Sequence, residues 1–523
     1  MPTLTPARSS QLVRITGVAA VALFLLLVAR FWHPVYGFTR FLQLDASNDT
    51  VKIAAFQTEP VYVYRNTGGY DGLYYAQIAY HPGLGDPELA PAMDNLAYRA
   101  RRILPPALAW LFAGGQTAWI AQVYSLLNVA AWLALAVMLW RPLASTGPRG
   151  LIAWLGVLFS AGALGSVRFA LTDLVALAFI CGALLAVENR RSRLAVGLLA
   201  AAGLARETSL LALAGLMEPA WFSRRNLARA LFVVTPLAAW LVYIHWRVGA
   251  ADPGWGNFAP PFTGFMQKLL SGADTSLHPD PDHMLLTWAS FLATIGLAVQ
   301  AAFILTRWRL HDPWWRAGLA AICLMVFLGT AVWHGFPGAA TRVLLPLTLA
   351  FNVLATRDHA APAWLLAGNF AVFSGLLMLL DVHHDPRELA AARVAGSGVV
   401  VRAGDGWFDA EHSLRHHWTW SSGHGPLDIE SWPHQTHRLR LEFNLRSLSP
   451  RNVTVTQNGV LLWSGRAGVE RAAAAIDFPL VEGHARLEFA SDPPVASGAS
   501  GTDARPLAFA VYDLRVTLPE SER

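Results

Sequence analysis

Apolar segments of about the length that crosses a membrane dominate this 523-residue chain and constrain what it can fold into. A helix needs about 20 apolar residues to cross the roughly 30 Å hydrocarbon core of a bilayer. Hydrophobic residues make up 54% of the sequence and charged residues only 14%, which disfavours a soluble protein. We expect nine spans, at 12–31, 117–140, 150–166, 168–187, 229–247, 285–306, 316–333, 340–356 and 362–380. The first has no small-residue cleavage site after it, so we expect a retained anchor.

Arginines in the short loops between these segments predict the orientation of the chain. Positive charge collects in cytoplasmic loops of membrane proteins. By this rule the N-terminus is cytoplasmic, and so are the loops that carry arginine. These are Arg141 and Arg149, "ENRRSR" (188–193), "SRRNLAR" (223–229), "RWRLHDPWWR" (307–316) and "TRD" (356–358).

The stretch between Arg193 and Glu218 has to leave the cytoplasmic side and return to it. Its two apolar halves, 194–204 and 208–217, are joined by "ARET", and each corresponds to about 18 Å of helix, too short to cross a bilayer. We therefore expect a short hairpin. Counting it as two gives about eleven segments, with three extracytoplasmic regions at 32–103, 248–284 and beyond about 381.

The C-terminal part of the chain has a different periodicity. Short alternating runs such as "RLRLEFNL" and "NVTVTQNGVLLW" are separated by Asn-Gly, Ser-Pro and Gly-rich turns. This pattern is typical of an all-β sandwich. The predicted fold is a polytopic α-helical membrane domain over residues 1–390, followed by an extracytoplasmic β-sandwich over 397–520.

Charged residues inside apolar segments are the first functional candidates. An ionisable residue in a span costs about 2.5–3.5 kcal/mol on insertion scales, so those that persist usually face a cavity. Arg206 and Glu207 at the hairpin tip form an ion pair with each other, line such a cavity, or do both. Arg168 and Arg342 lie at the outer ends of spans, where arginine is disfavoured. They either bind a phosphate or extend to lipid headgroups.

The stretch "NTGGYDGLYYAQIAYHP" in the first extracytoplasmic loop carries the candidate catalytic acid, Asp71. Asp-Gly is a turn signal, so the carboxylate either bonds its own turn or acts as a general base. The flanking tyrosines suit a surface on which a sugar stacks; they are Tyr70, Tyr74 and Tyr75. Asp45 is a second acid in the same loop. Downstream, Arg99, Arg101 and Arg102 precede an apolar stretch with two prolines, which predicts a basic juxtamembrane helix able to meet a lipid phosphate.

Metal, disulfide and nucleic-acid sites find little support. Both cysteines, Cys181 and Cys323, lie inside apolar runs. The histidines of "LHPDPDH" (277–283) and "DVHHD" (381–385) lack the spacing of a metal site. The net charge of +5 comes from arginines at segment ends and does not indicate nucleic acid.

The order of these motifs resembles bacterial membrane glycosyltransferases of the GT-C superfamily, over about residues 12–380. The resemblance rests on "YDGLYYAQIA", "YRARRILPPALAW", "RFALTDL", "LARETSLLAL" and "TRVLLPL". It implies a polyprenyl-phosphate-linked sugar donor, an essential acid at Asp71 or Asp45, and phosphate-binding arginines. The positions that match these phosphate-binding arginines are Arg101, Arg102, Arg206 and Arg342. The tail is similar to β-sandwich modules of envelope glycosylation proteins. No cofactor is assigned, and with no strict Asp-X-Asp pair a divalent cation stays an open alternative.

The resemblance implies transfer of a sugar to a glycan, lipid or protein acceptor on the outer face of a bacterial inner membrane. Asp71 would take the acceptor proton, direct displacement would invert the anomeric centre, and the arginines would stabilise the leaving phosphate. Two alternatives stay open. One is a transporter or flippase for a polar lipid, although paired broken helices are not evident. The other is a noncatalytic scaffold of an envelope-polysaccharide system.

Overall fold

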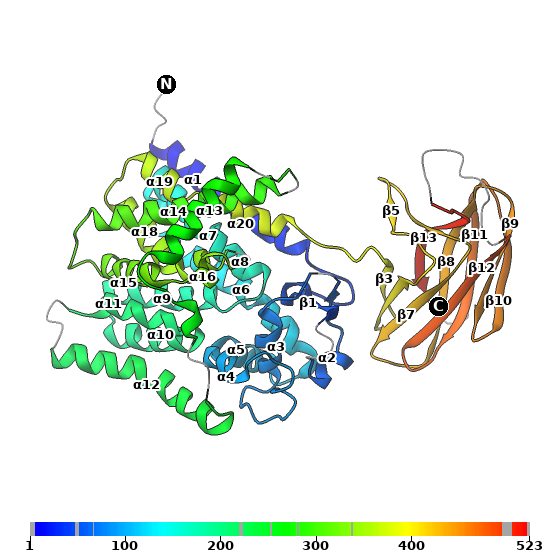
Figure 1. The fold of residues 1–523 in the computed structure, drawn as a ribbon, viewed down its shortest axis with the longest axis horizontal. Helices are drawn as coiled ribbons and strands as arrows, with labels where there is room; N and C mark the ends of the chain where they lie inside the picture. Colours follow the sequence, from blue (N-terminus) through cyan, green and yellow to red (C-terminus); the bar gives the residue numbers. More distant parts are fainter. Residues whose placement is uncertain are drawn as a thin grey trace. The chain divides into compact units, whose positions relative to one another are not determined.

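The computed structural model describes residues 6–47, 52–65, 67–218, 223–250, 254–278, 280–281, 283–335, 338–493 and 505–519. The chain divides into two compact units (Figure 1). The helical unit comprises residues 1–31, 38–54 and 66–382, and the β unit comprises 32–37, 55–65 and 383–523. Two short pieces of the predicted first loop thus belong to the β unit.

Among the residues described, four helices of the helical unit are long and apolar enough to cross a membrane. They are α1 (Pro6–Ala29), α6 (Thr117–Trp140), α12 (Arg224–Arg247) and α14 (Met284–Leu305). Two bent pairs raise the number to at most six. One joins α7 (Pro148–Leu158) to α8 (Ala161–Arg168) at 40°, and the other joins α19 (Pro362–Gly368) to α20 (Ala371–Leu380) at 42°.

The expected eleven segments are not confirmed, because several predicted spans are shorter or broken helices. At 1.5 Å per residue, a helix of 16 residues extends only about 24 Å. The remaining helices of the unit's interior are α9 (Asp173–Glu188), α15 (Pro313–Phe327), α16 (Thr330–Trp333), α17 (Ala339–Val343) and α18 (Leu345–Arg357). The predicted outer loop 248–284 contains η6 (Trp255–Asn257) and a further helix, α13 (Thr263–Leu277).

The predicted hairpin is present as a broken helical element. Its first half is α10 (Ser192–Ala205), and its second half is η5 (Glu207–Ala212) followed by α11 (Leu213–Leu216). The break falls at Arg206, whose backbone is extended. Because the helix stops there, the side chains of Arg206 and Glu207 can bind residues of other elements.

The first loop folds onto the helical unit through short elements. They are η1 (Thr39–Leu42), β1 (Leu44–Asp45), α3 (Gly72–Tyr80), α4 (Leu96–Arg99), η3 (Ala100–Arg102) and α5 (Leu104–Phe112). Gly72 explains the Asp-Gly sequence: a Cβ there would lie 2.3 Å from the carbonyl oxygen of Phe169, just after α8. Only glycine allows this close approach, which places Asp71 beside the link between α8 and α9.

The helical unit has two chemically different ends, joined by helices such as α9. At the end where α9 finishes, Glu188 lies 2.5 Å from Arg357, and Arg307 lies 3.5 Å from Asp358. Arg149 donates to the His359 carbonyl at 3.3 Å. We call this the arginine-rich end, because the arginine-bearing loops of the sequence meet there. The opposite end, where α9 begins at Asp173, is the site end.

The β unit is built from two antiparallel sheets, as the strand periodicity predicted. Their orders are β10-β9-β12-β7-β4-β3 and β11-β8-β13-β6-β5. Alternate side chains of strands such as β12 are buried, and residues of both sheets share one hydrophobic core. The strands are β3 (Glu388–Val394), β4 (Ser397–Ala403), β5 (Glu411–His412), β6 (His417–Ser421), β7 (His424–Trp432), β8 (His437–Ser447), β9 (Arg451–Gln457), β10 (Val460–Ala467), β11 (Ala472–Leu480), β12 (His484–Asp492) and β13 (Phe509–Thr517).

The two loop pieces of the β unit are held by specific contacts. His33 lies 2.9 Å from Glu388, and the Arg402 guanidinium donates to the Tyr36 hydroxyl at 2.5 Å. The second piece contributes α2 (Ala54–Thr58), which begins at its boundary, and β2 (Val63–Tyr64). Tyr62 follows the same pattern, because its hydroxyl accepts from the backbone N–H of Asp385 at 3.0 Å. The β unit is therefore completed by residues that precede Asp71 in the sequence.

Candidate functional site

Asp71 occupies the N-cap position of α3, but its side chain does not cap the helix. Instead, Oδ2 lies 2.8 Å from the Arg99 guanidinium, and the side chain is 32% exposed. The interpretation that this acid only bonds its own turn is therefore wrong. Among the described residues Oδ1 has no partner within bonding distance. One oxygen is fixed, and the other is free to accept a proton.

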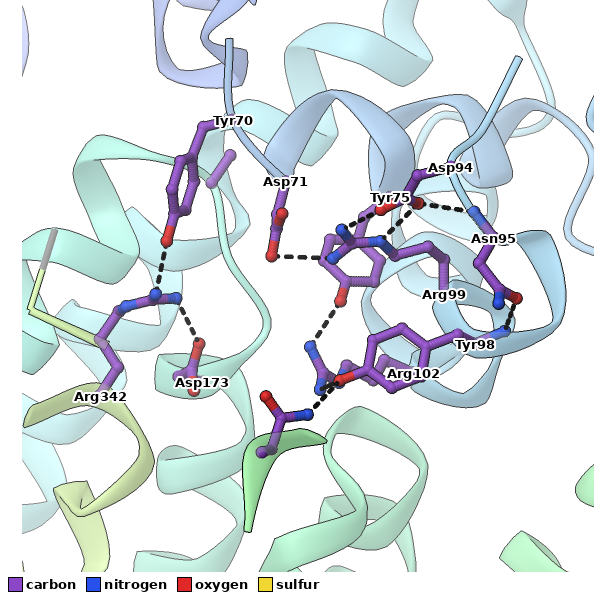
Figure 2. Close-up of polar contacts among 12 residues, drawn as sticks. Tyr70, Asp71, Tyr75, Asp94, Asn95, Tyr98, Arg99, Arg102, Asp173 and Arg342 are labelled. Atoms are coloured by element: carbon purple, nitrogen blue, oxygen red, sulfur yellow. Dashed lines mark hydrogen bonds and ion pairs between the residues drawn. The ribbon is translucent and has the colours of Figure 1, made fainter. Parts of the chain in front are cut away.

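Arg99 is itself held in place by a second acid. Its Nε and Nη2 bind the two carboxylate oxygens of Asp94 at 3.0 and 2.6 Å, a bidentate pair (Figure 2). The guanidinium also lies over the Tyr74 ring, 4.9 Å from its centroid. Asp94 precedes Asn95, whose side chain caps α4, so the acid is positioned by the start of the helix that carries Arg99. The three residues form a chain, Asp94–Arg99–Asp71.

Asp45, the second acid candidate, has a different environment. It is 1% exposed, and its carboxylate accepts from the backbone N–H and hydroxyl groups of Ser47 and Thr67 at 2.7–3.0 Å. Burial alone would raise the pKa of Asp45, but these hydrogen bonds outweigh it and lower the pKa to about 2. A carboxylate with saturated oxygens and low proton affinity is a poor general base. The role of Asp45 is structural, because it links Ser47 and Thr67 within the first loop.

Arg102 connects the first loop to the broken hairpin. Its Nε lies 3.2 Å from Glu207, and its Nη1 donates to the Tyr75 hydroxyl at 2.6 Å. Its Nη2 lies 3.5 Å from the Tyr98 hydroxyl. Glu207 therefore pairs with a residue 105 positions away in the sequence. The alternative that Arg206 and Glu207 neutralise each other is wrong, because each binds a different partner.

Asp173, at the start of α9, binds two of the predicted arginines at once. Arg206 forms an ion pair with Oδ1, and Arg342 lies 3.5 Å from Oδ2. The Asp173 side chain is only 2% exposed. Arg342 also donates to the Tyr70 hydroxyl at 2.6 Å, which brings the residue before Asp71 into the same network (Figure 2). Figure 2 shows Asp71 between the Tyr70–Arg342–Asp173 group and the Arg99–Arg102 group.

The tyrosines of the loop are neutral hydrogen-bonding groups. Burial is the main cause that raises the pKa of Tyr70 to about 12, with the Arg342 charge acting in the opposite direction. Burial likewise raises the pKa of Tyr75. Both hydroxyls stay protonated near neutral pH and accept hydrogen bonds from guanidinium groups. Tyr74 stacks under Arg99 rather than joining these bonds.

The structure brings most of the predicted site residues together and leaves two at its margin. Arg101 lies over the Tyr98 ring at 5.3 Å, and Arg168 lies over Phe31 and Phe169 at 5.1 and 4.7 Å. The contacts above place the other candidates in three neighbouring groups, around Arg99, around Arg102 and around Asp173; these candidates are Tyr70, Asp71, Tyr74, Tyr75, Arg102, Arg206, Glu207 and Arg342.

Four residues of the cluster were not among the predicted catalytic or substrate-binding residues, although Arg99 was expected to lie in a segment able to meet a lipid phosphate. Asp173 and Arg99 both carried a signal, since one is an acid inside an apolar segment and the other begins the basic run 99–102. Asp94 and Tyr98 carried none. Together the arginines at 99, 102, 206 and 342 balance the acids at 71, 94, 173 and 207, so the cluster is electrically neutral while holding four guanidinium groups in fixed positions.

A metal centre finds no support in the described part of the chain. Within it, no group of three or more His, Cys, Asp or Glu side chains is arranged to hold a metal ion. The Asp71 cluster pairs each carboxylate with arginine instead.

Comparisons with known proteins give little similarity. No protein family model matches the sequence, and no curated protein matches it. Among solved structures, the cryo-EM structure of arabinosyltransferase EmbB from Mycobacterium smegmatis is similar over 79% of this chain, at 10% sequence identity and a TM-score of 0.19. The match covers 59% of that protein's own chain. At this degree of similarity we infer neither fold nor function from it.

Proposed function

We propose that this chain is an integral-membrane glycosyltransferase that moves a sugar from a polyprenyl-phosphate donor to a glycan, lipid or protein acceptor. The observation that carries the proposal is the half-open carboxylate of Asp71. Its Oδ2 is fixed 2.8 Å from Arg99 and its Oδ1 is unoccupied, within a cluster of arginines that are each paired with an acid, of which Asp173 is buried. A partly exposed base beside fixed cations suits a reaction in which a proton leaves one substrate and an anion forms on the other.

In the proposed reaction the acceptor hydroxyl donates its proton to Asp71 Oδ1. As that proton leaves, the hydroxyl oxygen attacks the anomeric carbon of the donor sugar. The bond from that carbon to the phosphate oxygen breaks, and its electron pair stays on the lipid phosphate. A single displacement of this kind inverts the anomeric centre, and the phosphate needs no acid catalyst to leave.

The arginines would stabilise the charge that develops on the leaving phosphate. Arg102 and Arg342 reach the cluster from the first loop and from α17, and each also binds a tyrosine hydroxyl. Because their acid partners fix them beforehand, little reorganisation is needed during the reaction. Tyr70 would border the sugar, whereas Tyr75, expected to do the same, is only 1% exposed and would hold Arg102 in place. Arg99 would act as a positioning residue that orients Asp71.

The sidedness of the reaction follows from the two ends of the helical unit. The arginine-rich end corresponds to the cytoplasmic side by the orientation rule. We therefore propose that the site end, the first loop and the β unit face the outside of a bacterial inner membrane. The shorter helices and the broken hairpin would cross or enter the bilayer together with the long spans.

The decisive experiment compares Asp71→Asn and Asp71→Glu with Asp45→Asn. Glycan products are measured in cells that lack the wild-type chain, together with membrane insertion of each variant. We expect Asp71→Asn to lower transfer by about 10²–10⁴-fold, the usual contribution of a general base. Asp45→Asn should retain transfer in the fraction that inserts. If inserted Asp71→Asn protein keeps full transfer, the base assignment fails and the transporter and scaffold alternatives regain their standing.

A further inference from the structure

A cavity at the arginine-rich end of the helical unit lies among helices α9, α10, α11, α12 and α15. Its volume is about 290 Å³, and no residue of the Asp71 cluster lines it. The polar lining is Arg190, Ser192, Glu218, Arg229, His311 and Arg316. Three guanidinium groups therefore face one carboxylate.

 

The buried cation of this cavity is Arg316, which is only 6% exposed. Its Nε, Nη1 and Nη2 donate to the backbone carbonyls of Ala214, Leu310 and Gly215 at 2.6–3.0 Å. No carboxylate of the described residues forms an ion pair with it, and nearby Asp312 lies 3.6 Å from Arg357 instead. Asp312 is near enough to act on the charge of Arg316, but the guanidinium bonds only to carbonyls, and a buried charge without a bonded carboxylate favours an anion in the cavity.

The other two arginines differ in how far they are committed. Arg229 lies 2.8 Å from Glu218, which uses the one carboxylate of the lining. Arg190 is exposed, its guanidinium has no bonding partner among the described residues, and its backbone is left-handed with φ of 56°. Two of the five N–H groups of Arg316 are also left over after its three carbonyl bonds. These donors suit the oxygens of a phosphate group.

We propose that this cavity binds the phosphate group of an anionic phospholipid. Exposed leucines occupy the helices beside the cavity, Leu194 on α10 and Leu227 and Leu231 on α12. Apolar side chains next to a basic cavity suit a ligand that has acyl chains as well as a charged headgroup, and basic pockets between membrane helices commonly bind such headgroups. The proposal is independent of the reaction at Asp71.

The test measures lipid binding to the purified full-length chain in detergent, by native mass spectrometry and by thermal shift. The probes are dihexanoyl phosphatidylglycerol, dihexanoyl phosphatidylcholine and inorganic phosphate. We expect phosphatidylglycerol to bind most tightly. Arg190→Gln should weaken its binding about fivefold, the effect of one arginine near a lipid surface. Arg224→Gln removes an exposed arginine outside the cavity and should leave binding unchanged.

A second pair of variants tests the cavity itself without changing charge. Val196 lines the cavity, whereas an added Cβ at neighbouring Gly197 meets nothing within 4 Å. Val196→Trp should abolish the preference for phosphatidylglycerol, and Gly197→Trp should keep it. Equal binding of the two lipids, equal effects of the two arginine variants, or full binding by Val196→Trp would overturn the proposal. Inorganic phosphate binding as tightly as phosphatidylglycerol would overturn the lipid assignment.

Discussion

The two ends of α9 hold arginines in different ways. At its start, Asp173 is 2% exposed and binds Arg206 and Arg342 together. At its end, Glu188 is 27% exposed, binds Arg357 at 2.5 Å and also accepts from the indole N–H of Trp314 at 2.8 Å. A buried carboxylate fixes its arginines before any substrate arrives, whereas an exposed pair competes with water. The difference separates a preorganised site from a solvated surface.

The largest expected effect comes from removing the buried carboxylate. Asp173→Asn leaves Arg206 and Arg342 without their shared counter-ion, and breaking a buried pair costs about 3–5 kcal/mol in the free energy of unfolding. Thermal unfolding in detergent, compared with Asp173→Glu, measures this effect. A melting temperature equal to that of the wild type would contradict the view that Asp173 holds the site end together.

Variants of Arg99 test whether this arginine orients the proposed base, Asp71. Arg99→Met should lower kcat of sugar transfer by about 10–100-fold, as expected when a reacting group loses its orientation. KM for the donor should change little, and Arg99→Lys should restore part of the rate. Asp94→Asn weakens the hold on Arg99 without changing Asp71, so its kcat should lie between those of the wild type and Arg99→Met. A change confined to protein yield or to KM would assign Arg99 a structural role only.

Asp45 contributes stability that depends on pH. Its folded pKa of about 2 lies below the ordinary value of 3.8, so its stabilisation is fully present above about pH 4 and is lost as the pH falls towards 2. Asp45→Asn should lower the free energy of unfolding by about 1–3 kcal/mol at pH 7, because buried donors lose a charged acceptor. Unfolding measured from pH 7 down to pH 2 should progressively narrow the difference between the variant and the wild type.

The smallest effect is expected at the other end of α9. Glu188→Gln removes an exposed pair with Arg357, and such pairs contribute about 0–1 kcal/mol. The same melting experiment that measures Asp173→Asn should detect little change, and added salt should reduce it further. A loss as large as that of Asp173→Asn would remove the distinction between the two ends.

Local patterns predicted much of the fold. The alternation of β8, β9 and β12 was readable because one face of each strand is buried. The break at Arg206 was readable because two short apolar halves flank a charged pair. The helix breaks at 159–160 and 369–370 were not, because hydropathy runs on across them. This is why the expected number of spans exceeds the four to six that the helices support.

The sequence predicted most residues of the candidate site, but it did not predict which acid pairs with which arginine. Asp71, Arg102, Arg206 and Arg342 were all identified from charge in unusual places. The sequence offered Glu207 as the neighbour of Arg206, yet Arg206 binds Asp173 and Glu207 binds Arg102. Adjacent residues at a helix break point in different directions, so neighbours in the sequence need not be partners in space.

The sequence by itself determined the apolar segments, the grouping of arginines in one set of loops and the all-β character of the tail, because each is a local pattern. Only the tertiary structure decided which acid each arginine binds and which loop acid keeps an open oxygen. Most of those outcomes depend on segments far apart in the sequence meeting at one end of the helical unit, as at Asp71–Arg99 and Asp173–Arg342. Local sequence patterns do not specify which distant segments come into contact.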